Sequence, residues 1–170
     1  MDVLVRCEDC LSSAERGAIR FVNEAAFGQA DEADLVDKLR VDGAVLVSLV
    51  AELEGSIVGH ILFSRAWVDT PAGSLAVVAL APMAVLPDHQ QQRIGSSLIR
   101  HGLDLLLAKG EKIVIVLGHR EYYPRFGFSS EKAESIESPF PKGSFMAMEL
   151  KPRALDGVVG KVRYPAAFGL

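Results

Sequence analysis

The sequence is poor in cysteine, and it lacks both basic runs and long apolar segments. Its two cysteines, Cys7 and Cys10, form one C-x-x-C pair. A structural zinc site needs four ligands, so we expect two free thiols in a reducing cytoplasm and no metal. The net charge of −4 disfavours a nucleic-acid partner, because phosphate contacts require clustered Lys and Arg. The longest apolar stretch, Leu75–Leu86, is shorter than the roughly 20 residues of a membrane span, and no signal peptide follows Met1. We therefore expect a cytoplasmic protein without a membrane partner.

Apolar residues are plentiful by contrast, at 49% of the 170 residues, which suits one folded domain with a large core. Their spacing alternates in some segments and follows a helical period in others. The expected strands are Val3–Arg6, Val45–Glu52, Ile57–Val68, Leu75–Leu86, Lys112–Leu117 and Phe145–Leu150. The expected helices run from a cap at Ser12 or Ser13 to Phe27, from Glu32 to Arg40, and from Ile94 to Lys109. This order predicts an α/β fold with a mixed sheet.

Three features refine the expected sheet. The tight turn at Gly55 joins its two flanking strands in a β-hairpin. Pro82 interrupts the long apolar strand, and because proline cannot donate to a ladder, we expect a bulge or a parting of strands near it. Lys112–Leu117 is expected to be a buried strand, parallel to its neighbour and joined to it through the preceding helix by a right-handed crossover.

Gln90–Ser96 is a mostly polar segment that leads into the apolar helix and includes its first turn, which begins at Ile94. A loop that leads into a helix N-terminus offers free backbone N–H groups and the positive end of the helix dipole to an anion. The segment is therefore either an ordinary helix start or a site for a phosphate or pyrophosphate. It contains neither G-x-G-x-x-G nor G-K-[ST], so known nucleotide loops fit it poorly.

The wider neighbourhood is more specific. The segment MAVLPDHQQQRIGSSLI, a strand ending in Val-x-Pro followed by a loop and a helix, resembles the acetyl-coenzyme-A loop of the GNAT N-acetyltransferase superfamily. Downstream, YYPRFGF resembles the tyrosine that this family places four residues before a Gly-Phe pair. The resemblance covers Val3 to Leu150 and is greatest to small bacterial acetyltransferases. It implies the GNAT fold within residues 1–150, with a mixed, mostly antiparallel sheet that splays at the acetyl-CoA site and is flanked by helices. Residues 151–170 would form a tail that packs on this domain or at an interface.

The resemblance also implies which residues hold acetyl-CoA as co-substrate. They are Met83, Ala84, Val85, Gln90, Gln91, Gln92, Arg93, Ile94, Gly95, Ser96 and Tyr123. In the register set by Val85 and Pro87, Arg93 stands where the family has the first glycine of its loop. A second register, beginning at Gln92, keeps Gly95 as that glycine but displaces the paired aliphatic residues of the helix. We prefer the first register because it keeps the paired aliphatic residues in place. In this register Arg93 needs a backbone conformation that a Cβ tolerates, and we expect its guanidinium to reach phosphate oxygens.

By the same resemblance, an amine attacks the thioester of acetyl-CoA directly, which produces a tetrahedral oxyanion and then a thiolate leaving group. The backbone N–H of Val85, at the splayed end of the strand, is the expected oxyanion donor. Tyr123 occupies the family's general-acid position, and Tyr122 is the alternative if the local turn is rotated. A core tyrosine with its hydroxyl at the surface is the structural alternative for Tyr123.

The sequence defines the base less well. Many family members use a glutamate on the long strand before the loop, often through water, but Leu75–Leu86 contains no acidic residue. His60, His119 and Glu121 are the candidates, with water acting alone as an equal alternative. His119 lies between the core strand and Tyr123, and it also suits a purely structural role.

The resemblance leaves the acceptor open, as a primary amine of either a small molecule or a protein. A non-catalytic acyl-CoA-binding or regulatory module on the same fold is the main alternative, and a nucleotide-binding protein that uses the same helix start is a third. The loop Ser138–Phe145 is either a wall of the acceptor pocket or an exposed connection. The tail, with Tyr164 and Phe168 as its expected anchors, has three possible roles: it covers core residues that would otherwise be exposed, it covers the acceptor cleft, or it forms a homodimer contact.

Overall fold

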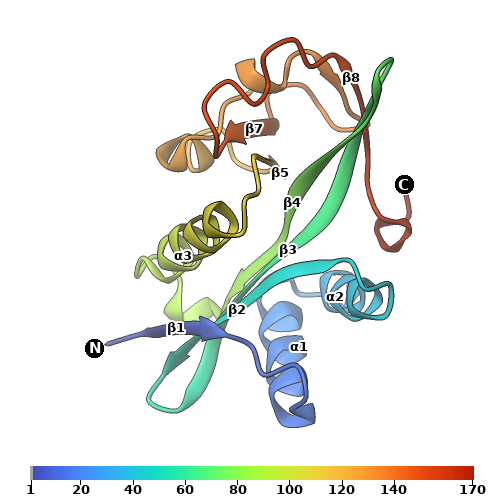
Figure 1. The fold of residues 1–170 in the computed structure, drawn as a ribbon. Helices are drawn as coiled ribbons and strands as arrows, with labels where there is room; N and C mark the ends of the chain where they lie inside the picture. Colours follow the sequence, from blue (N-terminus) through green and yellow to red (C-terminus); the bar gives the residue numbers. More distant parts are fainter. Residues whose placement is uncertain (1) are drawn as a thin grey trace.

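The structure, a computed structural model that describes residues 2–170, is built around an eight-stranded sheet (Figure 1). The strands are β1 (Leu4–Cys7), β2 (Val45–Leu53), β3 (Ser56–Thr70), β4 (Gly73–Val85), β5 (Ile113–Leu117), β6 (Ile136–Glu137), β7 (Phe145–Glu149) and β8 (Gly160–Arg163). The α-helices are α1 (Ser13–Phe27), α2 (Asp31–Val41) and α3 (Ile94–Ala108), and the 3₁₀ helices are η1 (Pro87–His89), η2 (Tyr123–Phe126), η3 (Glu131–Ala133) and η4 (Ala166–Phe168). Each strand and helix expected from apolar spacing is present, with ends within about two residues of those expected.

The sheet is mixed and mostly antiparallel, which confirms the expected fold class. Its main path runs β1-β2-β3-β4-β5-β7, and β8 pairs with both β3 and β6. The expected hairpin is formed by β2 and β3, and the expected parallel pair is formed by β4 and β5, which are connected through α3. Helices α1 and α2 cover one face of the sheet and α3 covers the other (Figure 1).

Alternation along the strands divides the core between these two faces. Leu49 and Phe63 pack on the face covered by α3, whereas their chain neighbours Val50 and Leu62 pack on the face covered by α1 and α2. Gly102 lets α3 approach the sheet closely, because a Cβ at this position would collide with the Phe63 ring. Helix α3 therefore packs directly against the strands that end beside its N-terminus.

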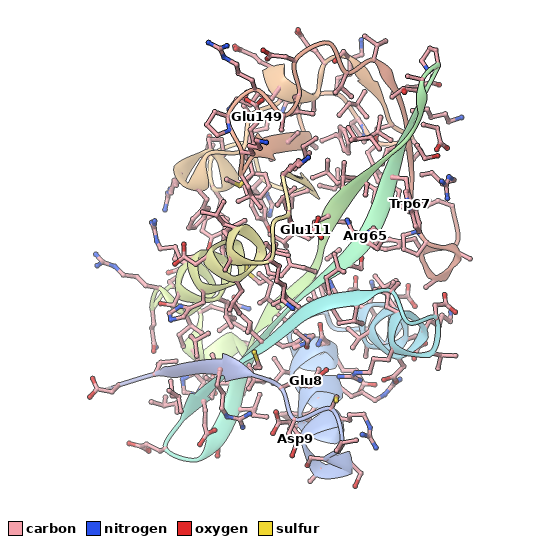
Figure 2. The ribbon with its side chains drawn as sticks, in the orientation of Figure 1. Glu8, Asp9, Arg65, Trp67, Glu111 and Glu149 are labelled. Atoms are coloured by element: carbon pink, nitrogen blue, oxygen red, sulfur yellow. The ribbon has the colours of Figure 1, made fainter. Side chains whose placement is uncertain are left out.

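An ion pair fixes the C-terminal end of α3 to β3. The Arg65 guanidinium donates to the Glu111 carboxylate, with Nη1 and Oε2 at 3.0 Å, and the same nitrogen donates to the Val77 carbonyl on β4 at 3.2 Å. Figure 2 shows Arg65 and Glu111 side by side between the sheet and the end of α3. Because both side chains are partly buried, this contact holds the orientation of α3 on the β3–β4 ribbon.

The sheet opens between β4 and β5. The two strands pair only over Val78–Leu80, opposite residues 114–116, although β4 continues to Val85. The register of β3 against β4 shifts between Ile61 and Phe63, opposite the segment that contains Pro82. The bulge and the parting of strands expected near that proline are therefore both confirmed, and they leave the end of β4 without a neighbour on the β5 side.

The C-terminal segment returns to the sheet, which its sequence did not predict. Strand β8 pairs with residues 67–69 of β3, and the Arg163 guanidinium lies 4.5 Å from the centre of the Trp67 ring. Tyr164 and Phe168, the expected anchors of the tail, pack against the core. No helix among the described residues combines the length and apolar character needed to cross a membrane. Cys7 and Cys10 are free, as expected, and both are exposed.

Candidate active site

A cavity of about 640 Å³ lies where β4 ends and α3 begins. Its walls come from the end of α1, the end of β4, the loop into α3, and the segment after β5. They are formed by Ala26, Phe27, Met83, Ala84, Val85, His89, Gln90, Gln91, Arg93, Ile94, Gly95, Ser96, His119, Tyr122 and Arg125. The cavity therefore joins the splayed strand end to the N-terminus of a helix.

The start of α3 presents a row of free donors to this cavity. The first helical bond is donated by the Ser97 N–H to the Arg93 carbonyl at 3.0 Å. Within residues 2–170, no backbone carbonyl accepts from the N–H groups of residues 91–96. The first turn of α3 carries no acidic residue and no side-chain cap. Such unpaired donors, together with the positive end of the helix dipole, favour an anion.

Two residues of this loop have left-handed backbones. Arg93 has φ 65° and ψ 13°, and Gln91 has φ 62°. We expected Arg93 to adopt a conformation that a Cβ tolerates. It instead adopts the left-handed conformation that glycine prefers, at a cost of about 1 kcal/mol. The loop thus has the shape of a glycine loop but carries an exposed guanidinium.

The end of β4 directs a backbone N–H into the opening. The Leu86 N–H donates to the Val58 carbonyl on β3 at 2.9 Å. Because such bonds alternate along an antiparallel ladder, the N–H and carbonyl of the preceding residue, Val85, point away from β3. The Val85 carbonyl accepts from Gln90 Nε2 at 3.0 Å. The Val85 N–H therefore faces the side that β5 has left.

The two neighbouring tyrosines have different surroundings. Tyr122 lines the cavity, with its hydroxyl 3.3 Å from Ser96 Oγ. The Tyr123 ring is 8% exposed and packs beside Gly118, where a Cβ would collide with it. Its hydroxyl forms no hydrogen bond within residues 2–170, and the hydroxyl oxygen is not completely buried. Burial raises the pKa of Tyr123 to about 12, with a smaller contribution from Tyr122.

The candidate bases are separated by the fold. His60 lies under α1, where its Nε2 is 2.9 Å from Ser48 Oγ and its Nδ1 is 3.2 Å from Asn23 Nδ2. Burial lowers the pKa of His60 to about 3, assisted by the charge of Arg40. Both ring nitrogens are therefore engaged and the ring is neutral, so His60 is a structural residue. His119 lines the cavity.

The residues expected to hold acetyl-CoA line this cavity, with the exceptions of Gln92 and Tyr123. Gln92 directs its side-chain amide back to the Asp88 carbonyl at 3.4 Å, although its backbone N–H belongs to the free row. The sequence did not indicate Phe27 as a wall of the cavity; its signal is an apolar side chain, 41% exposed, at the end of a helix. Arg125 was also missed, although it lies inside the YYPRFGF motif. No group of three or more His, Cys, Asp or Glu within the described chain could hold a metal ion.

Comparisons with known proteins agree with this geometry. The sequence model of the acetyltransferase (GNAT) family matches residues 15–128. An uncharacterized N-acetyltransferase of Escherichia coli K12, YjhQ, is 41% identical over 149 residues, which is 82% of each chain.

Solved structures resemble the whole chain. The GNAT family N-acetyltransferase YhbS from Escherichia coli, solved in complex with CoA, has a TM-score of 0.88 and 32% identity, over 99% of this chain and 92% of that one. A GNAT family acetyltransferase from Brucella melitensis, solved in complex with acetyl-CoA, has a TM-score of 0.81 and 34% identity, over 98% of both chains. The chain therefore belongs to the GNAT acetyltransferase family.

Proposed function

We propose that this protein transfers the acetyl group of acetyl-CoA directly to a primary amine of a small molecule or a protein. The observation that carries the proposal is the row of free N–H groups at residues 91–96, which opens into the same cavity as the end of β4. CoA contains a pyrophosphate, and free N–H groups at a helix start are suited to such an anion. Two similar proteins, from Escherichia coli and Brucella melitensis, were solved with CoA and acetyl-CoA respectively.

Arg93 extends this anion site in our proposal. Its guanidinium is exposed on a loop that carries a conformational cost of about 1 kcal/mol. A charge-assisted hydrogen bond to a phosphate oxygen more than offsets such a cost. We therefore assign Arg93 to the pyrophosphate, together with the backbone N–H groups of the loop.

The reacting thioester would then lie at the opening between β4 and β5. The amine nitrogen attacks the thioester carbon, and the negative charge that develops on the oxygen is stabilised by the Val85 N–H, which points into this opening. The carbon–sulfur bond then breaks, and the thiolate accepts a proton. We assign that proton to Tyr123, because YYPRFGF places this residue where the family has its general acid and a tyrosine hydroxyl is protonated at neutral pH. Tyr122, hydrogen-bonded to Ser96, positions the first turn of α3.

The attacking amine must also lose a proton. Strand β4 carries no carboxylate between Gly73 and Val85, and the buried His60 is already neutral and engaged. His119 lines the cavity directly after β5, so we assign it the proton of the amine.

The experiment that tests this function combines acetyl-CoA calorimetry with a CoA-release assay over polyamines, aminoglycosides, amino acids and peptides. Tyr123→Phe should lower kcat about 100-fold and leave the Kd for acetyl-CoA within twofold. Tyr122→Phe, its matched neighbour, should change the Kd more than kcat. His119→Asn should lower kcat and leave the Kd for acetyl-CoA within twofold. A reversal between the two tyrosine variants would assign the proton to Tyr122, and an unchanged kcat in His119→Asn would leave water as the base.

Two outcomes would contradict the function itself. If the wild-type protein binds acetyl-CoA but releases no CoA with any amine, it is a non-catalytic acyl-CoA-binding module, which the lack of a carboxylate on β4 would favour. If it binds no acetyl-CoA at all, the proposed site is wrong.

A further inference from the structure

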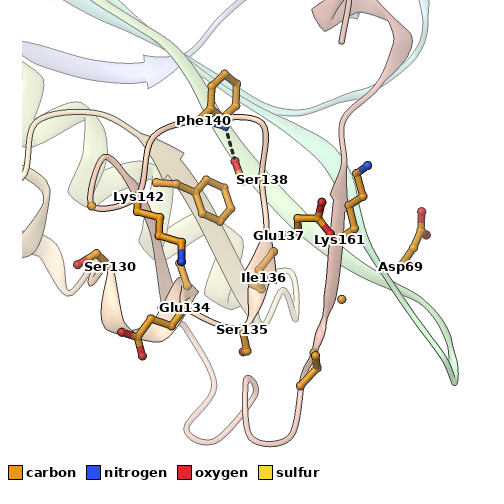
Figure 3. Close-up of a pocket in the computed structure, with 15 residues that line it drawn as sticks. Asp69, Ser130, Glu134, Ser135, Ile136, Glu137, Ser138, Phe140, Lys142 and Lys161 are labelled. Atoms are coloured by element: carbon orange, nitrogen blue, oxygen red, sulfur yellow. Dashed lines mark hydrogen bonds between the residues drawn. The ribbon is translucent and has the colours of Figure 1, made fainter.

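A second cavity, of about 770 Å³, lies among the C-terminal elements of the chain (Figure 3). Its walls come from η3 and β6, from the loop before β7, and from β8, with Asp69 of β3 at one edge. Apart from Asp69, every lining residue follows residue 128, the last one matched by the family model. The cavity is therefore built from parts of the chain that the family's common sequence pattern does not include.

This cavity has an apolar floor and a charged rim. Ala133, Ile136 and Phe145 form the floor and are at most 5% exposed. The rim carries three carboxylates, of Asp69, Glu134 and Glu137, and two ammonium groups, of Lys142 and Lys161. In Figure 3, Glu134 and Lys142 lie toward one side of the cavity, and Glu137 and Lys161 lie toward the other. Such a surface suits a ligand with an apolar body and charges of both signs.

Four of the rim charges, those of Glu134, Glu137, Lys142 and Lys161, are available to a ligand. All four side chains are exposed, and within residues 2–170 none of them forms an ion pair of 4.0 Å or less. The remaining rim charge, Asp69, is already held by Arg163 at 2.9 Å. A polycation would meet like charges at the two lysines, and a polyanion would meet like charges at the two glutamates. A peptide segment with both acidic and basic side chains pairs with all four.

The wall of this cavity is bonded to the segment that borders the first one. Phe145, at the start of β7, pairs with Leu117, the last residue of β5. The Gly118 N–H donates to the Ser144 carbonyl at 3.0 Å, and Arg120 Nη2 donates to the Lys142 carbonyl at 3.1 Å. Residues 117–120 thus connect the floor of the second cavity to His119 in the first. Only an elongated acceptor could occupy both cavities at once.

We propose that the second cavity binds the part of the acceptor beyond its reacting amine, and that the acceptor is a peptide or protein segment with charges of both signs. This inference rests on the proposed acetyl transfer. It assigns specificity to Glu134, Glu137, Lys142 and Lys161, while the chemistry stays at the end of β4.

The first test fills the cavity. Ser130 lines it, and the neighbouring Glu131 does not; both are exposed, so Ser130→Trp and Glu131→Trp are a matched pair. The probe is a hexapeptide with a free amino terminus and alternating Lys and Glu, assayed by CoA release against spermidine. Ser130→Trp should raise the KM for the peptide about tenfold and leave kcat and the KM for acetyl-CoA unchanged, and Glu131→Trp should leave all three unchanged. Equal effects of the two variants would overturn the proposal.

The second test removes charges without filling space. The double variant Glu134→Gln/Glu137→Gln should raise the KM about three- to tenfold for a peptide whose only charged side chains are Lys. The double variant Lys142→Gln/Lys161→Gln should have the same effect on the KM for a peptide whose only charged side chains are Glu. If each pair affects both peptides and spermidine equally, the proposal is wrong. If the wild-type protein releases CoA with spermidine as efficiently as with the hexapeptide, this proposal fails while the proposed acetyl transfer stands. If no amine releases CoA, the proposed function fails first.

Discussion

Helices α1 and α3 begin in opposite ways. At the start of α1, Ser12 Oγ accepts from the Glu15 N–H at 3.2 Å, and the Glu15 carboxylate accepts from the Asp9 N–H at 2.7 Å and pairs with Arg6 at 2.8 Å. At the start of α3 there is no side-chain cap and no acidic residue in the first turn. The N–H groups of residues 91–96, just before and at the start of α3, have no hydrogen-bond acceptor within residues 2–170.

This difference shows how one backbone property serves two purposes. Every helix leaves its first N–H groups without partners. In α1 one of those groups, the Glu15 N–H, is satisfied by the Ser12 hydroxyl, which stabilises the fold. In α3 they are left open beside a cavity, at a cost in stability, and they are available to an anionic ligand. The predictions below alter one of these two starts, except for one that concerns the histidine buried beneath α1.

The largest effect should come from closing the start of α3 with a carboxylate. Ser96→Asp puts a negative charge among the free N–H groups, where it competes with and repels a pyrophosphate, so the Kd for acetyl-CoA should rise at least about 100-fold. The same charge should raise the free energy of unfolding by about 0.5 kcal/mol. Calorimetry and urea denaturation measure both changes. Ser97→Asp is the control, since Ser97 does not line the cavity, and an equal loss of affinity in that variant would contradict the account.

The next effect concerns His60, which is buried beneath α1, and the pH dependence of stability. His60 accepts from Asn23 of α1 and has a pKa lowered to about 3 by burial, against about 6.5 when unfolded. Between these values the unfolded chain binds a proton that the folded chain does not, so stability falls as the pH decreases. From pH 7 to pH 5 this group should remove about 2 kcal/mol from the free energy of unfolding. His60→Gln should lose that part of the pH dependence, and an unchanged dependence in the variant would show that other groups cause it.

A smaller effect should follow from restoring glycine to the α3 loop. Arg93→Gly relieves a left-handed residue and should raise the free energy of unfolding by about 0.5–1 kcal/mol, while the Kd for acetyl-CoA rises about tenfold because the guanidinium is lost. Gln91→Gly is the matched variant, with the same backbone relief at φ 62° and no charge removed. Equal affinities in the two variants would mean that Arg93 does not contact the phosphates.

The smallest effect should come from opening the start of α1. Ser12→Ala removes the cap and should lower the free energy of unfolding by about 1 kcal/mol, without changing the Kd for acetyl-CoA. Ser13→Ala is the control, because the Ser13 side chain makes no capping bond. A loss of affinity in Ser12→Ala would show that the two starts are coupled, which the account does not allow.

The sequence predicts the long elements well because their signals are local. The apolar period of α3 and the apolar content of β3 each extend over several turns or residues, and Pro82 marks the bulge because proline cannot donate to a ladder. The position of the proposed anion loop also follows from sequence, since such a site needs only a polar segment between a strand and a helix.

The remaining features depend on contacts between distant segments. Strand β8 has only four residues and becomes a strand by pairing with β3, roughly 90 positions earlier. The burial of Tyr123 follows from its packing on Gly118, and no motif reports that contact. The left-handed backbone of Arg93 contradicts the residue's own preference, as is common where a loop is shaped for a ligand.

Backbone NMR during a titration with CoA tests the central claim most directly. The account predicts large downfield shifts of the amide protons of residues 91–96, whose N–H groups are free in the structure, because each gains a charged acceptor. The amides of Glu15 and Arg16 at the start of α1, which already have partners, should not move. Shifts confined to other parts of the chain, or none at saturating CoA, would contradict the assignment of the α3 start as the pyrophosphate site.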